Sequence, residues 1–154
     1  MVQKLETVLK LKSSAEQFYS LWKDRVYEVP TYTPSNVQEV DLCKGDWGIS
    51  GSILAWYYTM GGEEGVFKEK HIVDDENKIV ATIGLEGEVF NMYKVYNPIW
   101  EFIPKPNGCS LAKITLEYEK LNRTVPVPYN YMDFLIQITR DSDEGLIRES
   151  DCQN

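Results

Sequence analysis

Residues 44–60 read KGDWGISGSILAWYYTM, with glycines at positions 45, 48 and 51 ahead of a run of apolar and aromatic residues. Regularly spaced glycines can form a loop whose backbone N–H groups hold a phosphate, but such a loop opens a helix. Here Gly51 is followed by Ser52 and then by β-branched and aromatic residues, which favour a strand. We therefore expect a connection between two antiparallel strands, in which glycine supplies the positive φ angles of a tight path.

Strand patterns extend on both sides of this loop. The clearest alternation of apolar and polar residues is at 110–119, where Ala112, Ile114 and Leu116 share one face. Pro98 indicates a bulge or an edge position in its segment, because proline cannot donate to the ladder of hydrogen bonds. The segments predicted to be strands are 4–12, 37–42, 52–60, 65–73, 78–87, 93–103 and 110–119.

Helical patterns occur near both ends of the chain. Ser13 or Ser14 can cap a helix that continues through Trp22, and Pro30 and Pro34 are then expected to stop helical structure and leave a turn. A longer helix is predicted over 131–146, because inward-facing side chains recur there at helical spacing. These are Tyr131, Phe134, Leu135, Ile138, Ser142 and Leu146.

Together these elements predict a single α+β domain over residues 1–154. The antiparallel hairpins would present one apolar face and wrap around the last helix. The polar tail, residues 147–154, is expected to fray because it has little apolar surface to bury.

The composition excludes several classes of partner. The chain of 154 residues has 24 acidic and 16 basic side chains and a formal net charge of -8. Nucleic acid and anionic membrane surfaces attract basic proteins, so neither is expected as a partner. No apolar stretch is long enough for a membrane span, and the N-terminal segment lacks the apolar core of a signal peptide. We therefore expect a cytoplasmic location.

The residues that bind metals are few. Cys43, Cys109 and Cys152 are odd in number and widely spaced, which argues against a disulfide framework or a zinc site and fits a reducing compartment. His71 is the only histidine, and the acidic clusters lack the order of a calcium-binding loop. We predict no metal and no cofactor.

Several motifs occur over about Leu5 to Leu146, namely Gly45-Asp46-Trp47-Gly48, Gly51-Ser52, Lys68-Glu69, Glu86-Gly87, Tyr93-Lys94, Glu117-Tyr118-Glu119-Lys120 and 131–141. Together they resemble plant major latex proteins. The resemblance implies a Bet v 1-like helix-grip (START-like) fold, in which a curved seven-stranded antiparallel sheet wraps around a long C-terminal helix. It also implies two short N-terminal helices and an internal cavity for hydrophobic molecules, with Trp47 at the cavity mouth.

Aromatic residues are abundant, with ten Tyr, five Phe and four Trp, and they gather on particular strand faces. Leu54, Trp56 and Tyr58 share one face, and a later strand places Tyr96, Trp100 and Phe102 together. Such rings can simply fill a core, but the polar tips of Tyr and Trp also suit a pocket that recognises ligands. With the resemblance added, we expect Trp56, Tyr58, Tyr118 and Tyr131 to line a cavity.

The strand 65–73 has two mixed faces. Lys68 and Lys70 share one face with Val66, whereas Glu69 and His71 lie on the other. Periodicity does not choose between the faces, and the lysines could be solvated at the sheet rim. The resemblance favours lysines that face inward, where an ammonium could hold a ligand carboxylate or, with a pKa lowered by burial, act as a base. His71 lacks a nucleophilic partner, which makes it a weaker catalytic candidate.

The predicted function is the binding of a hydrophobic small molecule, such as a steroid-, terpenoid- or flavonoid-like plant metabolite. The alternative is a cofactor-free cyclase or isomerase of specialised metabolism, with Lys68, Tyr58, Tyr96 and His71 as catalytic candidates. A third interpretation is a hormone-receptor-like protein whose loops close over a ligand and recruit a partner. A monomer or weak homodimer is expected.

We predict that ligand contacts come from inward-facing residues of the strands, the glycine loop and the last helix. They are Gln38, Val40, Trp47, Leu54, Trp56, Tyr58, Val66, Lys68, Lys70, Thr82, Tyr96, Trp100, Phe102, Ile114, Leu116, Tyr118, Tyr131, Phe134, Ile138 and Ser142.

Overall fold

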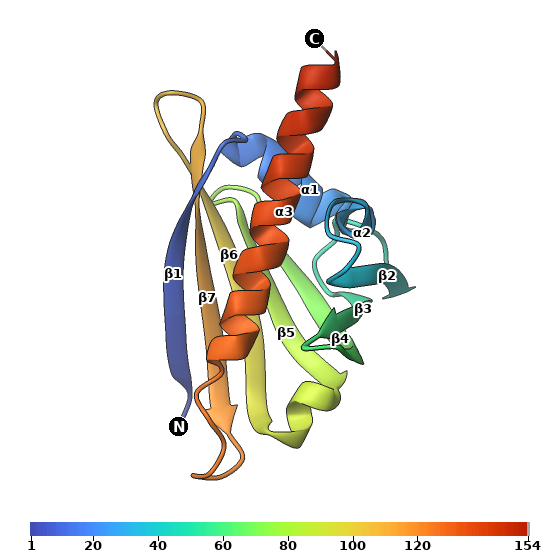
Figure 1. Ribbon diagram of the computed structural model, residues 1–154, viewed down its shortest axis with the longest axis vertical. Coiled ribbons are helices and arrows are strands. Elements are labelled where there is room, and N and C mark those ends of the chain that lie inside the picture. Colours follow the sequence, from blue (N-terminus) through green and yellow to red (C-terminus); the bar gives the residue numbers. More distant parts are fainter. Residues whose placement is uncertain (154) are drawn as a thin grey trace.

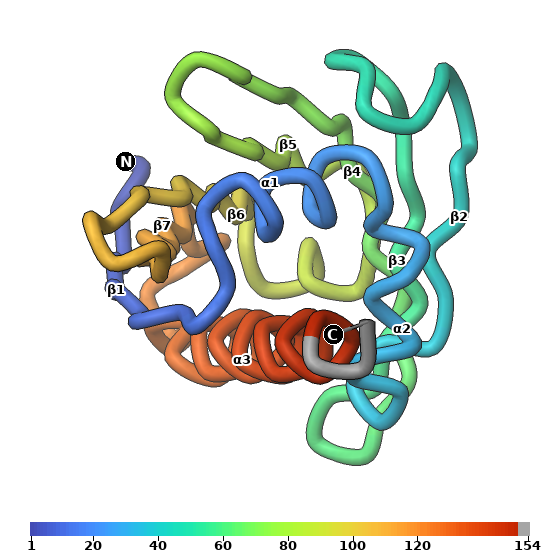
Figure 2. The backbone as a smooth tube through the Cα atoms, turned by 90° about the horizontal axis from the view of Figure 1, so that it is seen from above, coloured from blue at the N-terminus to red at the C-terminus, as the bar shows by residue number. Residues whose placement is uncertain are grey.

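The computed structural model describes the backbone of residues 1–153 and the side chains of residues 1–150, and a seven-stranded sheet dominates it (Figure 1). Neighbouring strands are antiparallel, in the order β1-β7-β6-β5-β4-β3-β2. The sheet curves around helix α3 (Tyr129–Gln153), which Figure 2 shows from its end. This confirms the predicted α+β helix-grip arrangement. The strands are β1 (Gln3–Leu11), β2 (Val37–Lys44), β3 (Ser52–Met60), β4 (Glu63–Asp74), β5 (Ile79–Gly87), β6 (Tyr93–Pro104) and β7 (Ser110–Lys120).

Helix α1 (Ala15–Asp24) follows β1 and begins with a capping box. The Gln17 N–H donates to the Ser14 hydroxyl (3.1 Å), and the Ser14 N–H donates to the Gln17 side-chain oxygen (2.9 Å). These bonds satisfy N–H groups that the first helical turn leaves without partners. The buried face of α1 packs on β6, where the ring centroids of Phe18 and Phe102 are 4.9 Å apart.

Helix α2 (Val29–Tyr32) corrects the expectation that Pro30 stops helical structure. A short 3₁₀ turn (Val26–Glu28) comes first, and Pro30 is then the second residue of α2. Proline is tolerated in a first turn, because the N–H that it lacks would have no helical partner there. Pro34 does lie beyond the end of α2. The chain therefore has the two short N-terminal helices that the family resemblance implies.

The loop between β2 and β3 holds its three glycines in the left-handed region. The φ angles are +88° at Gly45, +79° at Gly48 and +94° at Gly51. A Cβ at Gly48 would collide with the Asp24 carboxylate at the end of α1. The Gly51 N–H donates to the carbonyl of His71 (2.8 Å), which fastens the loop to β4. The loop connects two antiparallel strands, as predicted, and no helix follows it.

Strand β2 departs from the alternation expected of it. A register shift falls between Val37 and Glu39, and another lies near the end of the strand. Because the shift adds a residue, Val37 and Val40 are both buried although they are three positions apart, whereas Gln38 is exposed. Gln38 therefore lies on the outer face, and its amide donates to the carbonyl of Pro34 (3.0 Å).

Helix α3 is longer than predicted at both ends. It begins at Tyr129, directly after Pro128, and continues to Gln153 through the polar tail. Near its C-terminal end, the Ser150 hydroxyl accepts a hydrogen bond from the Gln17 side chain of α1 (3.3 Å). The contact shows that the last turns of α3 lie against α1.

Two further properties bear on the function classes. Of the described helices, none is long and apolar enough to cross a membrane. Among the residues that the structure describes, no cluster of three or more His, Cys, Asp or Glu is placed to hold a metal ion.

Candidate functional site

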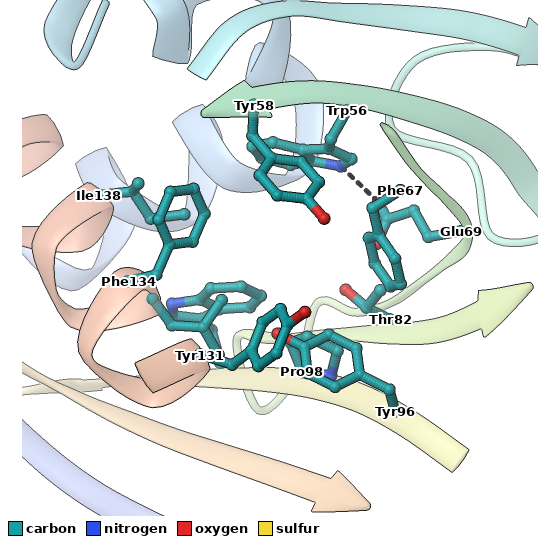
Figure 3. Close-up of a pocket in the computed structure, with 12 residues that line it drawn as sticks. Trp56, Tyr58, Phe67, Glu69, Thr82, Tyr96, Pro98, Tyr131, Phe134 and Ile138 are labelled. Carbon is teal, nitrogen blue, oxygen red and sulfur yellow. Dashed lines mark hydrogen bonds between the residues drawn. The ribbon is translucent and has the colours of Figure 1, made fainter. Parts of the chain in front are cut away.

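A cavity lies between α3 and the concave face of the sheet (Figure 3). Seven of its twelve lining side chains are aromatic. Its volume is about 50 Å³. Pockets for small molecules measure roughly 300–1,000 Å³. The lining residues are Trp56 and Tyr58 from β3, Phe67 and Glu69 from β4, Thr82 from β5, Tyr96, Pro98 and Trp100 from β6, and Tyr131, Phe134, Leu135 and Ile138 from α3.

The register of β3 and β4 brings several of these side chains together. Trp56 pairs with Phe67, and Tyr58 pairs with Gly65. Directly opposed residues project to the same face of a sheet, and Glu69, two positions after Phe67, shares that face. A Cβ at Gly65 would lie 2.6 Å from the Tyr58 ring, so the glycine leaves the space that the ring occupies.

Pro98 lies in the cavity wall just beyond the point where β5 and β6 stop pairing. The last pair of that ladder is Ala81 with Ile99. Beyond it, the Gly84 N–H donates to the side chain of Asn97 (3.0 Å) instead of to the β6 backbone. On the side that faces β5, the missing N–H of Pro98 therefore costs no backbone hydrogen bond. On that side Pro98 lies as it would at the edge of a sheet, which is one of the two positions that the sequence indicates.

Glu69 is a buried carboxylate in the cavity wall, with an exposed fraction of 2%. Its Oε1 accepts a hydrogen bond from the Trp56 indole N–H (3.2 Å), drawn as a dashed line in Figure 3. The same oxygen lies 3.4 Å from Nδ1 of His71, and Nδ1 has no hydrogen-bond partner among the described residues. His71 Nε2 lies 3.3 Å from the carbonyl of Lys23, which can only accept.

Three phenols contribute polar tips to the cavity. Figure 3 shows the hydroxyls of Tyr58 and Tyr131 pointing into the space, and no described protein group hydrogen-bonds either of them. Burial, and then the nearby Tyr131 and Glu88, raises the pKa of Tyr58 to about 12. Burial also raises the pKa of Tyr131 and, more strongly, that of Tyr96. All three phenols stay protonated near neutral pH and can donate hydrogen bonds.

Lys68 and Lys70 lie on the outer face of β4, so the inward orientation favoured by the family resemblance is wrong. The side chains that alternate with these lysines along β4, Phe67 and Glu69, line the cavity. The Lys68 ammonium lies 3.8 Å from the carboxylate of Glu86, and its side chain is 38% exposed. Both faces of β4 contain apolar residues, and pairing with Trp56 across β3 decides which one turns toward α3.

Trp47 does not line the cavity. Its ring packs edge-on against Tyr27 in the 3₁₀ turn, with centroids 4.9 Å apart. The side chain is partly buried and contributes to the hydrophobic core. Gly48 lies close to Asp24 at the end of α1, so the tip of the loop turns toward the helices.

The remaining predicted residues fall into three groups. The first lines the cavity and comprises Trp56, Tyr58, Thr82, Tyr96, Trp100, Tyr131, Phe134 and Ile138. The second is packed in the core outside the cavity, because neighbouring side chains cover it, and comprises Val40, Leu54, Phe102, Ile114, Leu116, Tyr118 and Ser142. The third lies on the outer face of the sheet with the two lysines and comprises Gln38 and Val66.

Four lining residues were not among those predicted, namely Phe67, Glu69, Pro98 and Leu135. Phe67 and Glu69 follow directly from the wrong choice of face for β4. Leu135 was assigned to the inner side of the last helix, and Pro98 shares the parity of Tyr96 and Trp100. The helical spacing of Leu135 and the strand alternation of Pro98 could therefore have identified both as lining residues.

The family model of the pathogenesis-related protein Bet v 1 family matches residues 1–149. The MLP-like protein 328 of Arabidopsis thaliana is 38% identical, over 92% of this chain and 94% of its own length. The crystal structure of the major latex-like protein 151 of Panax ginseng has a TM-score of 0.89 at 33% identity, over 94% of this chain and 97% of its own. A norcoclaurine synthase of Thalictrum flavum, at 16% identity and 97% coverage of both chains, has a TM-score of 0.75 and shares the fold alone.

Proposed function

Because the chain belongs to the pathogenesis-related Bet v 1 family, we propose that it binds a small hydrophobic molecule in the cavity between α3 and the sheet. The observation that carries the proposal is a mostly aromatic cavity into which protonated phenols project without protein partners. Aromatic surface supplies the apolar contact area, and a few hydroxyls fix the orientation of a ligand. By contrast, the Trp100 indole in the same wall already donates to the Thr139 hydroxyl (3.1 Å).

The cavity has to expand around a ligand. A cavity of about 150 Å³ is needed for a benzene-sized guest. The volume here is about 50 Å³. Tyr131 and Phe134 are only partly buried and line the wall from α3, with the Phe134 ring centroid 5.6 Å from that of Tyr58. We expect these two side chains to move aside, so that a compact ligand enters at less cost than a steroid or a flavonoid.

An enzyme needs a group that moves a proton near neutral pH. Of the predicted catalytic candidates, Lys68 lies on the outer face, and His71 lies behind Glu69 without lining the cavity. Tyr58 and Tyr96 line it, but their raised pKa values keep them protonated, which suits donors rather than bases. For these four candidates the geometry supports binding better than catalysis, and catalysis of a cyclisation or isomerisation is the weaker proposal.

Native mass spectrometry of protein purified from its own tissue tests the proposal directly. We expect a co-purifying mass that is lost on denaturation. Titration with the flavonoid naringenin should also give saturable quenching of tryptophan fluorescence. Trp56→Phe should reduce the fluorescence that the ligand quenches, because that ring lines the cavity. Trp47→Phe alters a ring outside the cavity and should leave both the dissociation constant and the ligand-dependent change in fluorescence unaltered.

Absence of any bound mass, together with absence of saturable binding by naringenin or a smaller neutral probe, would overturn the proposal. Quenching that depends on Trp47 but not on Trp56 would place the binding site elsewhere on the molecule.

A further inference from the structure

The cavity contains one ionisable group other than phenols, the carboxylate of Glu69. The other lining side chains are aromatic or aliphatic, apart from the Thr82 hydroxyl, and no lysine or arginine of the described chain is among them. The two lysines that could have supplied a cation, Lys68 and Lys70, lie on the opposite face of β4. A hydrophobic cavity with a single carboxylate discriminates between ligands by charge.

Glu69 is held in place but incompletely paired. Its Oε1 accepts from the Trp56 indole, whereas Oε2 has no hydrogen-bond partner among the described residues and is not sealed from the cavity. The side chain is 3% exposed, so water does not solvate it as it would at the surface. A buried carboxylate in this state favours a ligand that brings a hydrogen-bond donor and a positive charge.

His71 does not neutralise Glu69 while its ring is uncharged. Its Nε2 lies 3.3 Å from the carbonyl of Lys23, so Nε2 carries the proton in the neutral ring. Nδ1 is then an acceptor, 3.4 Å from Oε1 of Glu69. Two acceptors then face each other, so the neutral ring donates no hydrogen bond to Glu69.

We propose that the cavity selects a small protonated amine with an aromatic or compact hydrocarbon body, the ammonium contacting Glu69. This inference rests on the proposed binding function and names the class of ligand. The rings of Trp56, Phe67 and Tyr96 stand around the same space as the carboxylate. Their faces attract a cation through the quadrupole of the ring, and a desolvated carboxylate adds a charge-assisted hydrogen bond. Anionic ligands, which inward-facing lysines would have held, are repelled.

Three probes of one shape test the charge preference: 3-phenylpropylamine, 3-phenylpropan-1-ol and 3-phenylpropanoate. Their affinities are measured by isothermal titration calorimetry at pH 8. At this pH an alkyl ammonium with a pKa of about 10 is charged and a free carboxylic acid is ionised, so the three probes differ in charge. We expect the amine to bind at least tenfold more tightly than the alcohol, and the alcohol more tightly than the acid.

Two variants locate the effect. Glu69→Gln keeps the shape and an acceptor for Trp56 but removes the charge, and should abolish the tenfold advantage of the amine over the alcohol. Glu86→Gln removes an equal charge from the outer face, where Glu86 is 72% exposed beside Lys68, and should leave all three affinities unchanged. Thermal unfolding of both variants checks that they are folded. The order of the three affinities for the wild-type protein tests the charge preference even if a variant does not fold.

The outcomes separate the inference from the function on which it rests. Equal affinity for amine and alcohol, or tightest binding of the acid, overturns the charge preference but leaves hydrophobic binding standing. An amine preference that survives Glu69→Gln also overturns it, because the cation would then be recognised elsewhere. Failure of all three probes to bind at millimolar concentration overturns both.

Discussion

The carboxylate of Asp143, in the second half of α3, accepts hydrogen bonds from both the backbone N–H (2.9 Å) and the hydroxyl (2.5 Å) of Ser13. Its second oxygen accepts from the Lys12 N–H (2.9 Å). Ser13 in turn accepts at its carbonyl from the hydroxyl of Ser110 in β7 (2.9 Å). One buried side chain thus joins the helix to the turn between β1 and α1, and so keeps α3 over the sheet at the far end from Tyr129.

Asp143→Ala should destabilise the protein by about 3–5 kcal/mol, because it leaves the buried N–H and hydroxyl of Ser13 and the part-buried N–H of Lys12 without their acceptor. Asp133→Ala, at an exposed position of the same helix, should change stability by less than about 0.5 kcal/mol. The midpoint of urea unfolding at constant slope measures both. A cost below 1 kcal/mol for Asp143→Ala, on the order expected for a surface site, would show that the anchor is unimportant.

Ile138→Ala and Ile114→Ala remove the same atoms from different surroundings. Ile138 is 2% exposed and lines the cavity, whereas Ile114 is 0% exposed and lies outside the cavity. Because part of the Ile138 surface already faces empty space, we expect its truncation to cost about 2 kcal/mol and that of Ile114 about 4 kcal/mol. Chemical denaturation of both variants gives the difference, and equal costs would indicate that the space beside Ile138 is filled.

Gly48→Ala should be more costly than Gly61→Ala, although both glycines have positive φ. At Gly61, with φ of +61°, an added Cβ meets nothing within 4 Å, so only the conformational cost of about 1–2 kcal/mol applies. At Gly48 the Cβ also collides with the Asp24 carboxylate, which should bring the loss to about 3 kcal/mol. Thermal unfolding compares them, and a smaller loss at Gly48 would mean that the Asp24 side chain moves away freely.

Alkaline pH should destabilise the protein partly through Tyr58. Burial raises its folded pKa to about 12, whereas the unfolded value is near 10.0. The folded state keeps a proton that the unfolded chain releases, so this stabilisation is complete below pH 10 and is lost as the pH rises toward 12. After discounting for partial exposure, the share of Tyr58 is about 1–2 kcal/mol.

Tyr58→Phe tests this contribution, since phenylalanine keeps the ring but cannot ionise. Urea unfolding between pH 9 and 11.5 should show a shallower loss of stability for the variant than for the wild type. If the two proteins lose stability in parallel over this range, the phenol of Tyr58 ionises as readily in the folded state as in the unfolded chain.

Local pattern was enough for much of the architecture. The alternation at 110–119 predicts β7 nearly to the residue, and Ser14 is one of the two caps that the sequence offers for α1. The three glycines at 45, 48 and 51 predict a strand connection because only a backbone with positive φ fits there, which is a property of single residues. The spacing of Tyr131, Phe134 and Ile138 likewise identifies the side of α3 that lines the cavity.

Other features depended on contacts between distant segments. Alternation divides β4 into a lysine face and a Glu69 face, but both contain apolar residues, and only pairing with Trp56 in β3 turns Glu69 toward α3. The Trp47 ring packs against Tyr27 because the glycine loop lies close to Asp24 at the end of α1, which is distant in the chain. A strand pattern specifies which side chains share a face, whereas the packing of the whole sheet against the helix decides which face is inside. In this protein, packing of the sheet therefore places the carboxylate of Glu69 in the cavity wall and leaves Lys68 and Lys70 on the outer face.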